Sequence, residues 1–414
     1  MAETVLDKFL RYVKVYTTSQ EGVTTIPSTQ RQFDLANMLR DELVTLGMAD
    51  VRVDDHAIVY STLESTLEED TEVPTVAFFA HMDTSPDEPG ENVKPQIIKS
   101  YDGGVITYPG NPDLKLSPED TPELARFVGE DIITSDGTTL LGADDKAGVA
   151  EIMTAMEQLI ESGKPHGTIK VVFTPDEEVG NGVEALDVDE LGADYGYTID
   201  GDMLGVLEVE NFNAANGTIT LKGYNVHPGY AKGKMVNALR AIPDIMALFP
   251  ADQAPETTEK YEGFTHPMSV TGDVNEVKIR FLIRDFDHEE MMAKKHAIEL
   301  MGDQVKQRHP GLDVVVDIKE SYRNMREIID QHPEVVEIAE EAIRRAGVEP
   351  IHKPVRGGTD GARLSFRGLP TPNIFSGGMN FHSKNEFIPV IALEKGVETV
   401  LGIIDLIVER NKKQ

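Results

Sequence analysis

The sequence predicts an α/β fold in which helices flank a central sheet, interrupted by an inserted α+β domain of the ferredoxin-like type. Residues 73–80 and 168–174 are continuous apolar runs of strand length, as expected for strands that are buried on both faces. A long helical pattern lies between them, at 146–163. From about 210 to 322 the expected elements follow the order β-α-β-β-α-β, which is typical of ferredoxin-like domains.

The elements before the insertion are predicted from apolar spacing and composition. Residues 4–16 have the pattern of an amphipathic helix, because Leu6, Phe9, Leu10 and Val13 lie on one face. Residues 88–130 are rich in glycine, proline and aspartate, so we expect a surface excursion with one short helix at 117–128. The other predictions are a helix at 28–47 and strands at 51–53, 58–60 and 195–202.

An insertion is expected because the α/β pattern resumes after residue 322. The chain then consists of a discontinuous first domain, residues 1–210 and 323–414, and an inserted domain, residues 211–322. Within the insertion we expect strands at 218–223, 267–272, 275–285 and 312–318, and helices at 235–249 and 287–307. After it we expect helices at 333–346 and 391–411, and strands at 350–355 and 371–376.

Charge and composition exclude several classes of protein. The formal net charge of −33 argues against nucleic-acid binding, which relies on lysine and arginine, and against binding to an anionic membrane surface. The chain has no cysteine, so a metal would have to be held by histidine and carboxylate. No signal peptide is recognisable, and no apolar run approaches the roughly 18 residues of a membrane span. We therefore expect a soluble cytoplasmic protein.

Histidines and carboxylates gather at the ends of the predicted strands and at the start of one helix. They are His81, Asp83, Asp144, Asp145, Glu177, Glu178, Asp200 and His382. In open α/β sheets, ligands bind outside the carboxyl ends of the strands. Six carboxylates at one such edge would repel each other strongly, and metal cations would remove that repulsion. The pattern therefore predicts a metal site.

The number and type of these residues suit hydrolytic chemistry. Histidine and carboxylate ligands without thiolates favour Zn, Mn or Co. Two histidines with three carboxylates supply one shared ligand and two further ligands for each of two metals, which is the count for a site that activates water and polarises a carbonyl. The adjacent Glu177 and Glu178 can supply one metal ligand and one general base. Asp83 is placed to hydrogen-bond the imidazole of His81.

Several motifs together resemble the M20 metallopeptidases in order and spacing. They are His81-Met82-Asp83-Thr84, Gly142-Ala143-Asp144-Asp145-Lys146-Ala147-Gly148, Asp176-Glu177-Glu178-Val179-Gly180 and the late His382. Stretches at 225–229, 235–238, 283–287 and 354–361 bring the resemblance closest to the tripeptide aminopeptidases of that family, over nearly the whole chain. The resemblance implies a zinc-peptidase-like catalytic domain, with a mixed central sheet flanked by helices, and an inserted lid or dimerisation domain.

The resemblance also implies two Zn²⁺ ions per subunit, with Co²⁺ or Mn²⁺ as substitutes. By motif, one ion would be held by His81, Asp144 and Asp200. The other would be held by Asp144, Glu178 and His382, with Asp144 bridging the two. The family further leads us to expect a cis peptide bond between Asp144 and Asp145.

Catalytic and substrate-binding roles follow from the same resemblance. Glu177 would be the general base, and Asp83 would orient His81. His227 and Arg284 on the lid, with Arg356 on the catalytic domain, would grip the scissile carbonyl or the substrate carboxylate, for which the bidentate arginine fork is suited. Family members also lead us to expect a homodimer through the lid.

One residue departs from the family pattern. Asp202 stands where we expect glycines after Asp200-Gly201. An additional carboxylate near the metals could raise metal affinity, bind a substrate amine, or be a solvated loop residue.

The predicted function is that of a two-metal aminopeptidase that releases the N-terminal residue of tripeptides. Two alternatives stay open, one within the hydrolases and one from a different class of protein. The same site could serve an M20-type dipeptidase or amide deacylase, or the chain could bind metal and peptide without turnover. A general base at Glu177 argues against a pure binding protein, because binding needs no base.

Overall fold

The computed structural model describes residues 3–68 and 71–411, which form two compact units. Unit 1 lies within Met1–Val209, Glu327–Lys353 and Thr359–Gln414, and unit 2 consists of Glu210–Arg326 and Pro354–Gly358. The sequence places residues 354–358 with the first domain, whereas here they group with unit 2. The reason is local, because the N–H of Phe212 donates to the carbonyl of Val355, and Arg356 donates to main-chain carbonyls at Lys260 and Glu262.

Unit 1 is built on an eight-stranded mixed sheet. Its strands, in spatial order, are β1 (Ala49–Val53), β2 (Val59–Leu63), β8 (Ile169–Thr174), β3 (Val76–His81), β9 (Tyr195–Gly201), β16 (Asn373–Phe375), β10 (Val206–Glu208) and β15 (Ile351–His352). The central strands β8, β3, β9 and β16 are parallel, whereas β2 pairs antiparallel with β1 and β8. The mixed central sheet predicted from the family resemblance is therefore confirmed.

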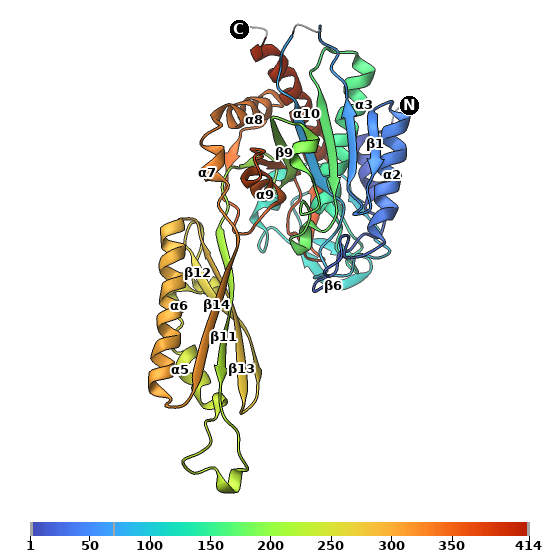
Figure 1. Ribbon diagram of the computed structural model, residues 1–414. Coiled ribbons are helices and arrows are strands. Elements are labelled where there is room, and N and C mark those ends of the chain that lie inside the picture. Colours follow the sequence, from blue (N-terminus) through green and yellow to red (C-terminus); the bar gives the residue numbers. More distant parts are fainter. Residues whose placement is uncertain (1–2, 69–70, 412–414) are drawn as a thin grey trace. The chain divides into compact units, whose positions relative to one another are not determined.

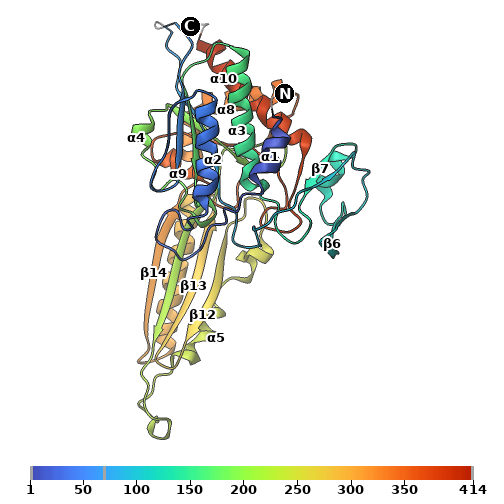
Figure 2. The same cartoon turned by 90° about the vertical axis from the view of Figure 1, so that its right-hand side faces the viewer.

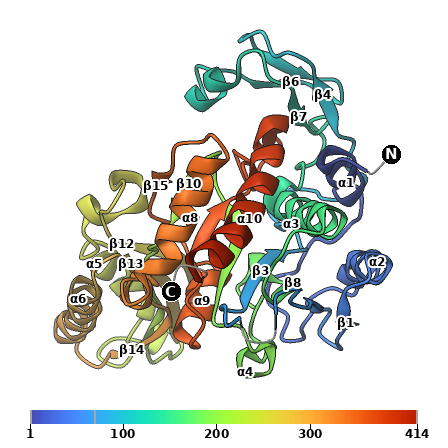
Figure 3. The ribbon, with the colours of Figure 1, turned by 90° about the horizontal axis from the view of Figure 1, so that it is seen from above.

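Helices cover both faces of this sheet (Figure 3). They are α1 (Val5–Tyr12), α2 (Gln32–Thr45), α3 (Ala143–Ser162), α4 (Val188–Leu191), α8 (Pro333–Arg345), α9 (Asp360–Phe366) and α10 (Val390–Asn411). The short α7 (Arg326–Ile329) lies in the sequence where unit 2 ends and unit 1 resumes. Strand β3 is buried along its whole length, with Phe78 in the core beneath α3 and α10 and Phe79 in the core on the α9 side. Gly148 lets α3 approach β9 closely, because a Cβ there would lie 1.9 Å from the carbonyl oxygen of Ile199.

The excursion after β3 has more structure than the sequence predicts. It contributes β4 (Gln96–Ile98), β5 (Ile106–Tyr108), β6 (Asn111–Leu116) and β7 (Ile132–Thr134), and β7 pairs with β4 and with β17 (Phe387–Pro389). Figure 2 shows β6 and β7 in cyan on the α1 side of unit 1. The strands β4, β5 and β7 have three residues each, which is too short to give a readable alternation, and the six-residue β6 is mostly polar, so the sequence did not reveal them. The expected helix at 117–128 is a 3-10 helix, Pro122–Phe127.

Unit 2 is a four-stranded antiparallel sheet with helices on one face (Figure 1). The strands are β12 (Phe264–Gly272), β13 (Glu276–Asp285), β11 (Asn213–Lys222) and β14 (Asp313–Tyr322), in that spatial order. Its core packs Ile219 and Ile279 of the sheet against Met291 of α6 (His288–Arg308). The single helix expected at 235–249 is wrong. Pro243 interrupts it, so a 3-10 turn, Ala238–Ala241, precedes the short α5 (Ile242–Met246).

Within the described part of the chain, no helix combines the length and apolarity that crossing a membrane requires.

Candidate metal centre

The predicted site residues lie at the carboxyl edge of the parallel strands in unit 1. His81 is the last residue of β3, Asp200 lies near the end of β9, and Glu178 follows β8. These three strands are neighbours and run in the same direction, so their carboxyl ends meet. Asp144 comes from the start of α3 and His382 from the loop between β16 and β17.

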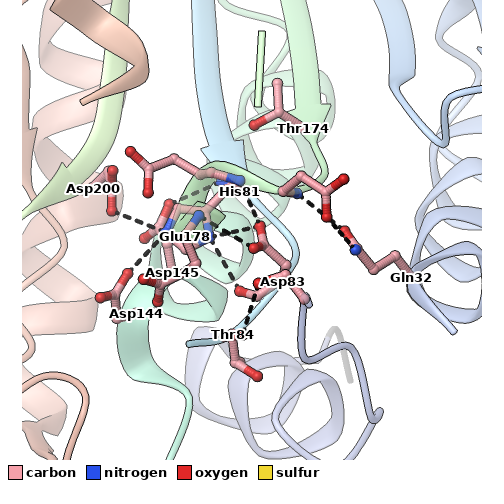
Figure 4. A network of polar contacts seen from close by, with 12 residues as sticks. Gln32, His81, Asp83, Thr84, Asp144, Asp145, Thr174, Glu178 and Asp200 are labelled. Carbon is pink, nitrogen blue, oxygen red and sulfur yellow. Dashed lines mark hydrogen bonds and ion pairs between the residues drawn. The ribbon is translucent and has the colours of Figure 1, made fainter. Parts of the chain in front are cut away.

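The five predicted metal ligands converge on one another, and Figure 4 labels four of them, His81, Asp144, Glu178 and Asp200. His81 Nε2 lies 2.8 Å from Oδ1 of Asp144 and 3.4 Å from Oδ1 of Asp200. His382 Nε2 lies 3.2 Å from Oδ2 of Asp144 and 2.8 Å from Oε2 of Glu178. Asp144 therefore faces a histidine on each side, which is the position expected of a bridging carboxylate.

Two sets of three ligand atoms have the spacing of a metal-binding group. One set comes from His81, Asp144 and Glu178, and the other from His81, Glu177 and Asp200; within each set all atoms lie within 4.8 Å of one another. These sets differ from the division of ligands that the family resemblance implies. The two sets share His81, and the second set places the carboxylate of Glu177 beside the predicted ligands His81 and Asp200.

Asp83 contacts both the loop after β8 and the imidazole of His81. Its carboxylate accepts hydrogen bonds from the main-chain N–H groups of Glu177, at 3.0 Å, and Glu178, at 3.3 Å. Its Oδ1 also lies 3.4 Å from Nδ1 of His81, which is 3.1 Å from the Asp83 carbonyl. The imidazole is thus fixed with Nε2 directed toward Asp144 and Asp200.

Burial and mutual repulsion shift the pKa values of these carboxyl groups. Burial, and then the charge of Asp200, raises the pKa of Glu177 well above its usual range. Burial, and then the charge of Asp144, raises the pKa of Glu178 to about 8. For His81, burial lowers the pKa, but the carboxylates of Asp200 and Asp144 outweigh it and leave the pKa well above its usual value. In the absence of a cation, burial and mutual repulsion therefore disfavour the ionised forms of Glu177 and Glu178.

The donor set fits a metal ion. Imidazole nitrogens and carboxylate oxygens are ligands for Zn²⁺ and similar cations. In addition, Oε1 of Glu178 is buried and has no hydrogen-bond partner within residues 3–68 and 71–411. A buried carboxylate oxygen without a donor is costly, and a cation would satisfy it. The peptide bond between Asp144 and Asp145 is cis, as the family resemblance led us to expect.

The three predicted substrate-binding residues belong to unit 2. His227 accepts a hydrogen bond at Nδ1 from the N–H of Gly229, so a neutral ring carries its proton on Nε2. Arg284 donates to the main-chain carbonyls of Ala215 and Ile283. Arg356 donates to the main-chain carbonyls of Lys260 and Glu262 and stacks on Phe212. Both guanidinium groups are thus engaged within unit 2.

Asp202 has a partner in unit 1. It forms an ion pair with Lys353, and its Oδ1 accepts the N–H of Met203. Both side chains are partly exposed. This pairing favours the interpretation of Asp202 as a surface loop residue.

Sequence reasoning assigned no structural role to several buried residues that hold the site together. Asp145 accepts hydrogen bonds from the main-chain N–H groups of His81, at 3.2 Å, and Gly148, at 3.1 Å. Asp176 accepts a hydrogen bond from the side-chain amide of Gln32 at 2.7 Å, which joins the loop after β8 to α2. Glu386 accepts three main-chain N–H groups around Asp144. Only their closeness in sequence to the ligands could have indicated them.

Known proteins resemble this chain over nearly its full length. Peptidase T of Halothermothrix orenii is 48% identical over 403 residues, which cover 97% of this chain and 98% of that protein. Among solved structures, aminopeptidase PepT from Bacillus cereus has a TM-score of 0.76 at 28% identity, with 98% of each chain covered. A tripeptidase from Staphylococcus aureus has a TM-score of 0.76 at 26% identity, again with 98% of each chain covered.

The family model described as peptidase family M20/M25/M40 matches residues 135–406. That range includes Asp144, Glu177, Glu178, Asp200 and His382 of the converging cluster. Because this match covers more than half of the chain, and the full-length relatives agree with it, the chain belongs to peptidase family M20/M25/M40.

Proposed function

We propose that this protein is a two-metal aminopeptidase that releases the N-terminal residue from tripeptides. The observation that carries the proposal is the convergence of two histidines on Asp144, with Glu177 beside them. The names of the relatives, a Peptidase T, an aminopeptidase and a tripeptidase, support the substrate class.

The metal ligands are assigned within this proposal. His81, Asp144 and Asp200 would hold one ion, and Asp144, Glu178 and His382 the other. Zinc is proposed as the metal because the ligands are imidazole and carboxylate, with cobalt and manganese as substitutes. When bound, the ions would polarise the peptide carbonyl and lower the pKa of a water molecule.

Glu177 is proposed as the general base. Its main chain is held by Asp83, and its carboxylate lies within 4.8 Å of the ligand atoms of His81 and Asp200. A carboxylate in this position can accept the proton of the attacking water and return it to the leaving amine.

Unit 2 has a proposed role that rests on the family resemblance alone. We propose that it is the lid and that His227, Arg284 and Arg356 take part in substrate binding. A homodimer through this unit is a prediction of the same kind. The cytoplasmic location expected from the sequence also stays a prediction.

Metal content measured together with peptide cleavage tests the proposal. The metal-free and zinc-loaded protein are compared on matched di-, tri- and tetrapeptides, before and after chelation. We expect two ions per chain and cleavage that prefers the tripeptide, is lost to the chelator and returns with metal. Preference for a dipeptide or an acylated amino acid would indicate a dipeptidase or deacylase. Bound metal and peptide without any product would indicate a binding protein.

A further inference from the structure

Glu386 is a buried carboxylate with an unusual set of partners. Glu386 is 1% exposed, and within residues 3–68 and 71–411 the hydrogen bonds that its carboxylate accepts come from main-chain N–H groups. Oε2 lies 2.7 Å from the nitrogens of both Leu141 and Gly142, and Oε1 lies 3.0 Å from the nitrogen of Asp144. Three donors around one carboxylate fix its position and that of the donating turn.

The turn that Glu386 holds begins α3 and carries Asp144. Gly142 is the N-cap of this helix, with a φ of 83°, and a glycine supplies no side chain to accept the first N–H groups. These groups must find another acceptor when they are buried. Glu386 supplies it from a segment 242 to 245 residues away in sequence.

The segment that carries Glu386 is the loop that carries His382. Met379 and Phe387 pair as an antiparallel bridge, which closes a hairpin around both residues. Inside it, the hydroxyl of Ser383 donates to the carbonyl of Asn380, and the N–H of Glu386 donates to the carbonyl of Ser383. Phe387 continues into β17, which pairs with β7. The hairpin is therefore held internally and by a strand of the excursion.

Glu386 joins these two rigid pieces. In the described part of the chain, the hydrogen bonds between the 141–144 turn and the His382 hairpin are the three that Glu386 accepts. The other polar contact between the two pieces is that of His382 with Asp144, at 3.2 Å. Glu386 thus connects the segments that carry His382 and Asp144. These two side chains must keep a set distance if they are to bind the same ion.

We propose that Glu386 is a positioning residue for the metal centre, which sets the distance between His382 and Asp144 and so the affinity for metal. This proposal rests on the metal-binding function proposed above. Residues that orient metal ligands typically contribute about 10–100-fold to metal affinity or activity. We expect an effect of this size at Glu386 although it does not face the ion.

The test compares Glu386→Gln with Glu386→Asp and with a matched control, Glu208→Gln. Glutamine keeps the size of the side chain but replaces one acceptor oxygen by a donor, which opposes the N–H groups. Aspartate keeps the charge but is too short to reach all three donors. Glu208 is also buried in unit 1, and its carboxylate accepts from the side chain of Asn373 rather than from the 141–144 turn.

Two readouts are taken on each protein. Hydrogen exchange of the metal-free protein reports the amides of Leu141, Gly142 and Asp144, and titration with Zn²⁺ or Co²⁺ reports metal affinity. In Glu386→Gln we expect faster exchange at these amides and an affinity lower by about 10–100-fold. Glu386→Asp should fall between this variant and the wild type, and Glu208→Gln should show neither faster exchange at these amides nor a comparable loss of metal affinity.

The outcomes separate this proposal from the function on which it rests. If the wild type binds two ions and Glu386→Gln binds them as tightly, the positioning role is wrong and the proposed metal centre stands. If Glu208→Gln loses as much affinity as Glu386→Gln, the effect is general to buried glutamates and the positioning role is also wrong. A wild type that binds no metal would overturn both proposals.

Discussion

Oδ1 of Asp83 accepts a hydrogen bond from the main-chain N–H of Glu177 at 3.0 Å, and Oδ2 accepts that of Glu178 at 3.3 Å. The same carboxylate lies 3.4 Å from Nδ1 of His81. Asp83 is completely buried, so no water competes for these contacts. One side chain thereby fixes a predicted metal ligand on β3 together with the loop that supplies the predicted base and a second ligand.

Asp83→Asn should weaken metal binding and turnover together. Asparagine offers one acceptor oxygen, and its amide nitrogen would face a main-chain N–H. We expect metal affinity and kcat/KM to fall by about 10–100-fold, measured by metal titration and by tripeptide cleavage in saturating metal. Asp194→Asn is the matched control, because Asp194 accepts the N–H of Thr75 just before β3, away from the site. An equal loss in the control would assign the effect to the strand.

Glu177→Gln and Glu178→Gln should separate base from ligand. Glutamine cannot accept the proton of water, so Glu177→Gln should lose turnover by at least about 100-fold while it keeps both ions. Glu178→Gln should lose metal, because a neutral amide is a poorer metal ligand than a carboxylate and no longer offers the cation a negative charge. Metal content by elemental analysis and cleavage rates at saturating metal check the pair. A metal-replete Glu177→Gln enzyme that still turns over would remove Glu177 from the mechanism.

The sequence predicts the sheet and the cluster because each follows from local patterns. The apolar run before His81 has the length and composition of a buried strand, and a polar group at its carboxyl end lies where ligands bind. The family resemblance adds the mixed order of the strands and the cis bond at Asp144, which spacing alone does not contain.

The residues that hold the cluster could not be predicted in this way. Glu386 acts through contacts made across more than 240 residues, and nothing in its neighbours indicates a main-chain acceptor. Likewise, Asp176 and Gln32 meet only because the loop after β8 returns to α2. Such contacts depend on tertiary packing, and a pattern of hydrophobic spacing carries no information about them.

Asp202→Asn should leave metal content and activity unchanged. Asp202 is paired with Lys353, and both side chains are partly exposed, so the pair should contribute no more than about 1 kcal/mol to stability. We expect two ions per chain and a kcat/KM within about twofold of the wild type, by the criterion that surface substitutions have small effects. Lys353→Met provides the complementary control, because it leaves the carboxylate in place. A loss of metal in Asp202→Asn, but not in Lys353→Met, would instead support a metal-binding role for this carboxylate.

Glu208 should make the folded protein less stable as the pH rises. Burial raises its pKa from 4.5 to about 8, and the amide of Asn373 only partly offsets this. Between these values the folded state holds a proton that the unfolded state has released, so the free energy of unfolding falls as the pH increases. At roughly 1.4 kcal/mol per unit, the total effect is on the order of 5 kcal/mol.

Glu208→Gln should remove this pH dependence. Glutamine does not titrate and its carbonyl oxygen can still accept from Asn373, so the variant should melt at nearly the same temperature as the wild type at pH 5 and at a higher temperature at pH 8. A gain of 1 kcal/mol corresponds to roughly 2–4 °C in a domain of 150–250 residues. Thermal melting of both metal-free proteins at pH 5, 6.5 and 8 measures the difference, in which the titrating groups that do not interact with Glu208 cancel; Asp200 and Asp202 do interact with it. A difference that does not grow with pH would mean that Glu208 is ionised in the folded protein and that its charge is stabilised by its surroundings.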